Sequence, residues 1–113
     1  MKSKRIGRIE DLLVQETSSV IMNRLKDPRI GMVTIVAADV SPDIQNAIIY
    51  YSVMGGEREK EQAAAGLAHA ASFIRRELAQ VLTIKSMPRL QFVFDGSAEH
   101  AERLDMLIKG LSA

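Results

Sequence analysis

The sequence predicts an α+β fold in which helices cover a three-stranded sheet. Two kinds of periodicity lead to this prediction. Apolar residues recur at three- and four-residue steps in three long stretches, and β-branched or aromatic residues alternate with others in three shorter ones. The chain has 113 residues, of which 47% are hydrophobic, and a net charge of +1. This size and composition suit a single domain over residues 1–113 and exclude a wholly disordered chain.

The first element is expected to be a helix over about Ser3–Leu25. Apolar residues such as Ile6 and Leu13 fall on one side of this segment at helical spacing. The pair Asp27-Pro28 ends the helix, because proline disfavours α geometry in the residue before it.

Two strands are expected next, over Met32–Val40 and Asn46–Val53, because both segments are rich in β-branched residues. They are joined by Ser41-Pro42-Asp43, in which proline presets the backbone and the flanking side chains can bond nearby N–H groups. Asp39 and Asp43 flank this turn and are therefore expected to cap it rather than to act as an acid and a base. So short a link between consecutive strands predicts antiparallel pairing.

The segment Glu57–Leu82 has the apolar period of a helix, and its middle is rich in small residues, including Ala63–Gly66 and Ala70–Ser72. Small residues allow a close approach of the helix to the sheet. They also allow a bend, because glycine and serine weaken the helical ladder. A third strand over Leu90–Phe94 and a last helix beginning at Ser97 complete the predicted order.

Basic residues gather in three regions of the sequence that hold few acids. These are Lys2, Lys4, Arg5 and Arg8; then Arg24, Lys26 and Arg29; then Arg75, Arg76, Lys85 and Arg89. A segregated charge map can present a positive face to a polyanion even when the net charge is small. On composition alone a solvated surface is the simpler interpretation, because about a quarter of any soluble domain is charged.

Few residues could carry catalysis or hold a metal ion. The chain has no cysteine, which excludes disulfides, thiol nucleophiles and thiolate metal sites. Its two histidines, His69 and His100, make no metal-ligand spacing. The glycine spacing excludes phosphate-binding loops and the G-x-x-G loop of standard KH domains. We therefore expect a protein that is not an enzyme and that needs no metal and no other cofactor.

Nothing in the sequence indicates secretion or a membrane span. The segment Met1–Leu13 carries Glu10 and Asp11 before any apolar run develops, which is unlike a signal peptide. The charge-free runs are shorter than the roughly 18–20 residues that span a bilayer. The expected location is the cytoplasm, with no membrane partner.

Four segments together resemble one bacterial family. They are Asp27-Pro28-Arg29, Val40–Ile44, Ala70–Leu78 and Pro88–Phe92, in that order and at the family's spacing. The sequence resembles ribosome-binding factor A over about Arg5–Leu107. The resemblance implies a type II KH-like fold, helix–strand–strand–helix–helix–strand. It also implies that a kinked Ala-x-Gly junction replaces the G-x-x-G loop.

The junction in this chain is Ala70-Ala71-Ser72, with serine where the family usually has glycine. The resemblance therefore favours the bend over the close approach. It predicts that the helix breaks near these residues.

The resemblance further implies a binding function. The protein is expected to bind immature 30S particles through 16S rRNA and to support late maturation of that rRNA, as a monomer on the free small ribosomal subunit. The basic residues expected to contact RNA are Arg5, Arg8, Lys26, Arg29, Arg75, Arg76, Lys85 and Arg89. A general RNA-binding KH-like module that acts on other transcripts would show the same basic face and is the alternative.

Overall fold

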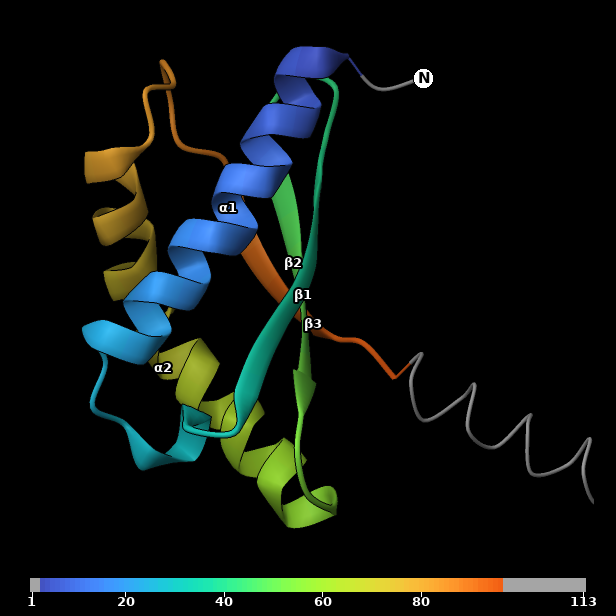
Figure 1. Ribbon diagram of the computed structural model, residues 1–113, viewed down its shortest axis with the longest axis vertical. Coiled ribbons are helices and arrows are strands. Elements are labelled where there is room, and N and C mark those ends of the chain that lie inside the picture. The colour runs from blue at the N-terminus through green and yellow to red at the C-terminus, as the bar shows by residue number, and fades with distance from the viewer. Residues whose placement is uncertain (1–2, 97–113) are drawn as a thin grey trace, which may run out of the picture.

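The computed structural model describes residues 3–96, and Figure 1 shows how its elements are arranged. The elements are α1 (Lys4–Asn23), a short 3-10 helix η1 (Pro28–Ile30), β1 (Val33–Val40), β2 (Asn46–Val53), α2 (Glu57–Val81) and β3 (Arg89–Phe94). The predicted α+β fold is confirmed, and β2 has the predicted bounds. The predicted helix from Ser97 lies outside the described residues.

The three strands form one sheet in the order β1-β2-β3. β1 and β2 are antiparallel, as the short turn predicts, whereas β2 and β3 are parallel. Parallel neighbours need a crossover, which α2 provides. Both helices lie along one side of the sheet in Figure 1, and the opposite face of the sheet is left without a helix among the described residues.

The core lies between the helices and the sheet. In β2 the alternate residues Ala47, Ile49 and Tyr51 are buried, which fixes the face that meets the helices. β1 keeps both Ile35 and Val40 in the core, although a regular strand would place residues with this odd offset on opposite faces. A register shift between Ile35 and Ala37 makes this possible, because a bulge returns the following residues to the correct face.

Side-chain hydrogen bonds fix the start of α1 and the turn between the first two strands. The Ser3 hydroxyl accepts a hydrogen bond from the Ile6 N–H at 3.2 Å and caps α1. The Asp43 carboxylate accepts hydrogen bonds from the Ser41 hydroxyl at 2.7 Å and the Gln45 N–H at 3.1 Å. The predicted capping role of Asp43 is thus confirmed.

The predicted break in the second long helix is wrong. α2 is one α-helix from Glu57 to Val81, and it runs through Ala70, Ala71 and Ser72 without interruption. Alanine is the strongest helix former, and serine, unlike glycine, adds little freedom to the unfolded backbone, so nothing local ends the helix there. The ribbon of α2 does change direction along its length in Figure 1. The helix therefore bends without dividing in two.

Candidate nucleic-acid interface

The structure brings basic residues from two distant segments together at one end of the molecule. Arg5 and Arg8 project from the first turns of α1, and Lys85 lies in the loop after α2. Arg5 and Lys85 line one hollow, and Arg5 and Arg8 line a second hollow together with Ile84. All three basic side chains are exposed. We call Lys4, Arg5, Arg8 and Lys85 the helix-start cluster.

Lys4 was not among the predicted contact residues, yet it lines the same hollow as Arg5 and Arg8. Its place in the first charged group of the sequence was the only signal for it. Asp43 also lines the hollow that holds Arg5 and Lys85, but its carboxylate is bonded within its own turn. These hydrogen bonds lower the pKa of Asp43 below its ordinary value, so the carboxylate is ionised at neutral pH.

A second pair of predicted residues lies elsewhere, in the connection between α1 and β1. Lys26 and Arg29 line a hollow of about 410 Å³ that faces the middle of α2, where His69 and Ala70 lie. We call it the connection hollow. The remaining lining residues, apart from Asp27, are Leu25, Pro28 and Phe73.

Arg29 is held by Asp27. Its Nε and Nη2 atoms donate hydrogen bonds to the two carboxylate oxygens at 3.0 and 2.6 Å, and the Arg29 N–H donates to the same group at 3.0 Å. The Arg29 side chain and then its N–H lower the pKa of Asp27 from 3.8 to about 2. Asp27 is therefore ionised at neutral pH and neutralises one positive charge of the connection hollow.

Gly66 lets η1 pack directly against α2. A Cβ atom at this position would lie 2.8 Å from Ile30 Cγ2 and 3.1 Å from Arg29 Cβ, which is too close without movement of η1. The small residues of α2 thus do serve a close approach, but at Gly66 the partner is η1 rather than the sheet. This contact fixes Arg29 at the rim of the connection hollow.

The adjacent arginines of α2 differ in what they contact. Arg75 donates hydrogen bonds from Nη2 to the Met87 carbonyl at 3.0 Å and from Nε to the Pro88 carbonyl at 3.3 Å. Arg75 therefore holds the loop that leads into β3. Arg76 is exposed, and no hydrogen bond or ion pair joins it to the residues of the described part of the chain.

Arg89 belongs to neither group. It is the first residue of β3 and is exposed. Leu90, Phe92 and Phe94 pack against the core, so strand alternation places Arg89 on the sheet face that has no helix. The structure thus places the eight predicted residues in four separate surroundings.

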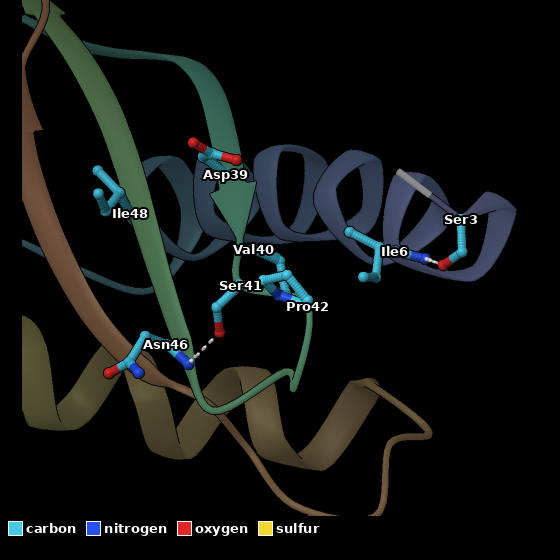
Figure 2. A pocket seen from close by; sticks show the side chains of 8 residues that line it. All are labelled: Ser3, Ile6, Asp39, Val40, Ser41, Pro42, Asn46 and Ile48. Atoms are coloured by element: carbon cyan, nitrogen blue, oxygen red, sulfur yellow. Dashed lines mark hydrogen bonds between the residues drawn. The ribbon is translucent and has the colours of Figure 1, made fainter. Parts of the chain in front are cut away.

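A further hollow, of about 740 Å³, lies between the start of α1 and the turn joining β1 to β2, and Figure 2 shows its eight lining residues. It contains no basic residue. Two of its hydroxyl oxygens accept hydrogen bonds from backbone N–H groups, Ser3 Oγ from Ile6 and Ser41 Oγ from Asn46 (Figure 2). Its lining therefore offers little to attract a polyanion.

The described residues bring basic binding groups together. Across residues 3–96 no three histidine, aspartate or glutamate side chains gather so as to hold a metal ion. No described helix is long and apolar enough to cross a membrane. What the arrangement offers is two basic regions of different character, which is a means of holding phosphates.

Comparison with known proteins identifies relatives over nearly the whole chain. Residues 5–108 match the family model of ribosome-binding factor A. The ribosome-binding factor A of Syntrophobacter fumaroxidans is 40% identical over 113 residues, which cover 98% of this chain and 97% of that protein.

Known structures of ribosome-binding factor A have a similar fold. The crystal structure of ribosome-binding factor A from Thermus thermophilus has a TM-score of 0.70 at 26% identity and covers 79% of this chain and 93% of that one. A second match is a homology model of the Thermus thermophilus factor as fitted into the cryo-EM map of its complex with 30S. It has a TM-score of 0.62 at 24% identity and covers 85% of this chain and 97% of that one.

Proposed function

The chain belongs to the ribosome-binding factor A family, and from this premise we propose that it binds the immature small ribosomal subunit through 16S rRNA and supports late maturation of that rRNA. The names of its relatives and the complex of the Thermus thermophilus factor with 30S support this proposal. In this role the protein acts in the cytoplasm, as a monomer, without a cofactor and without a covalent step of its own.

The observation that carries the proposal is the helix-start cluster. Arg8 and Lys85 are far apart in the sequence, yet both lie beside Arg5 at one end of the molecule. Exposed cations that gather in this way neutralise phosphates, which supplies affinity and orientation without reading bases. Specificity for the small subunit then comes from the folded shape of the rRNA.

Sedimentation tests the proposal. Tagged protein is expressed in cells that lack their own copy, and the gradient fractions are probed for it. We expect the protein with free small subunits that carry unprocessed 16S rRNA, and not with assembled ribosomes. Equal association with ribosomes, or with unrelated transcripts as strongly as with precursor subunits, would contradict the proposal and favour a general RNA-binding module.

A further inference from the structure

The connection hollow combines an apolar floor with a basic rim. Leu25, Pro28 and Phe73 supply apolar surface, whereas Lys26 and His69 supply polar nitrogen atoms at the edge. The hollow measures about 410 Å³, which falls in the range of sites that take small ligands. Such a lining suits a flat, weakly polar group that is linked to an anion.

The hollow is already formed before anything binds. Asp27 caps η1 and holds the Arg29 guanidinium with three side-chain hydrogen bonds. Gly66 allows η1 to rest on α2, so that both walls are held in place. A rigid site loses little conformational entropy on binding, which favours its use as a binding site.

The Asp27–Arg29 pair adds no net charge to the hollow. Asp27 is ionised and bonded to Arg29, so these two side chains together contribute no net charge. A phosphate inside the hollow would meet the Asp27 carboxylate, which is one of the lining groups. An uncharged base is not repelled, and the planar guanidinium of Arg29, with a side chain 40% exposed, offers a surface on which a base can stack.

One face of α2 continues this pattern along the helix. His69, Phe73 and Arg76 are four and three residues apart, which places them on the same face. Phe73 is half-buried, and Arg76 is exposed one turn beyond it. An aromatic ring between basic groups is the arrangement by which proteins stack a base and hold the neighbouring phosphates of single-stranded RNA.

We propose that the connection hollow binds one unstacked nucleotide of single-stranded RNA, with its base on Phe73 and its flanking phosphates at Lys26 and Arg76. The proposal rests on the proposed function, because it assigns to the rRNA an unpaired nucleotide as one point of contact. It gives the protein a preference for single-stranded RNA that the helix-start cluster, which meets only phosphates, does not have.

The test uses the full chain and hexameric single-stranded RNA that carries 2-aminopurine at its centre. The chain has no tryptophan, so the fluorescence of this base is observed without interference. Binding to the unmodified protein is expected to change the emission, since stacking alters it. A hexamer with an abasic site at the centre is expected to bind about tenfold more weakly, as the loss of one stacked base predicts.

Phe73→Leu keeps an apolar side chain and removes the ring. It is expected to weaken binding of the 2-aminopurine hexamer about tenfold and to leave binding of the abasic hexamer unchanged. The matched control is Phe92→Leu, which changes another half-buried phenylalanine, on β3 and outside the connection hollow. The control is expected to keep the full preference for the hexamer that carries a base.

A measurement on the unmodified protein covers the case in which Phe73→Leu does not fold. A hexamer with a central 5-iodouridine is irradiated in the complex, and the crosslinked peptide is expected to contain His69 or Phe73. Equal affinity for the two hexamers, or crosslinks only outside the hollow, would overturn this inference. Cosedimentation with precursor small subunits is measured in parallel. It tests the proposed function separately from this inference.

Discussion

The two basic regions of the molecule look alike in the sequence and differ in the structure. The helix-start cluster joins cations that make no ion pair among residues 3–96, and its hollows open between α1 and the loop after α2. The connection hollow joins Lys26 to an arginine that Asp27 already holds, over an apolar floor. Local density of basic residues therefore does not measure the charge available to a phosphate. A carboxylate in the same site determines how much of that positive charge remains available.

This difference assigns separate tasks to the two regions. Unpaired exposed cations give affinity that falls with salt, because they release counterions from the nucleic acid. A neutralised arginine over an apolar floor gives contacts that salt weakens little. Variants that change one region and leave the other intact test this division of tasks.

The largest effect is expected from the helix-start cluster. Replacing Arg5, Arg8 and Lys85 by glutamine removes three exposed cations. Affinity for precursor small subunits should fall about 100-fold near physiological salt, and the slope of log K against log[salt] should flatten by about two to three units. Filter binding over a range of salt concentrations measures both. Unchanged affinity at low salt would show that the phosphates are held elsewhere.

The next effect concerns the wall of the connection hollow. Gly66→Val places side-chain atoms where even a Cβ would lie 2.8 Å from Ile30 Cγ2. It should lower the free energy of unfolding by about 2–3 kcal/mol, as overpacking does. Thermal and urea unfolding measure the change.

Gly7→Ala is the matched control, since it is also a helical glycine but nothing lies within 4 Å of an added Cβ. It should raise the free energy of unfolding by about 0.5–1 kcal/mol through helix propensity. If both variants changed stability in the same direction, the close packing of η1 on α2 would not be the reason for Gly66.

A smaller effect separates the neighbouring arginines of α2. Arg75→Ala removes the hydrogen bonds to the Met87 and Pro88 carbonyls and should cost about 1–2 kcal/mol of stability. Arg76→Ala should leave stability within about 0.5 kcal/mol and flatten the salt slope by about one unit. Unfolding curves and salt titrations of the two variants are compared side by side. Equal losses of RNA affinity without a loss of stability would contradict the structural role of Arg75.

The smallest effect is a pH dependence at Asp27. Arg29 lowers the pKa of Asp27 to about 2 in the folded protein, against an ordinary value of 3.8. The contribution of this pair to stability is therefore complete above pH 3.8 and is lost as pH falls through about 2. The Asp27 carboxyl carbon, followed by NMR, should titrate in that range. In Arg29→Gln the same carbon should titrate at higher pH, near the ordinary value.

Much of the fold could be predicted because local signals and tertiary packing agree. The alternation in Asn46–Val53 gives β2 its bounds, and Asp27-Pro28 follows closely on the end of α1. The parallel pairing of β3 with β2 depends on contacts far apart in the sequence, which periodicity does not reveal. The break expected at Ser72 fails because the two residues before it are alanines, the strongest helix former.

The surroundings of the candidate residues could not be predicted, because a residue type does not reveal its neighbour. The sequence alone indicates that Arg29 and Arg75 are exposed cations. In the structure the Arg29 side chain pairs with Asp27, and the Arg75 side chain donates hydrogen bonds to two backbone carbonyls. In the sequence, only the spacing of Arg29 from Asp27 indicated its partner, and nothing indicated the partners of Arg75. Lys85 was a candidate from its charge alone, and only the fold places it beside Arg5.

Directed cleavage of rRNA tests most directly which surface faces the subunit. The chain has no cysteine, so Arg8→Cys, His69→Cys and Gln91→Cys each give a single attachment point for an iron chelate that generates hydroxyl radicals. Positions 8 and 69 lie in or beside the two basic regions, and Gln91 is exposed on the sheet face without a helix. With the chelate at positions 8 and 69, we expect strong cleavage of 16S rRNA at two separate places in bound precursor subunits, and little from position 91. Strong cleavage from position 91 alone would contradict the account.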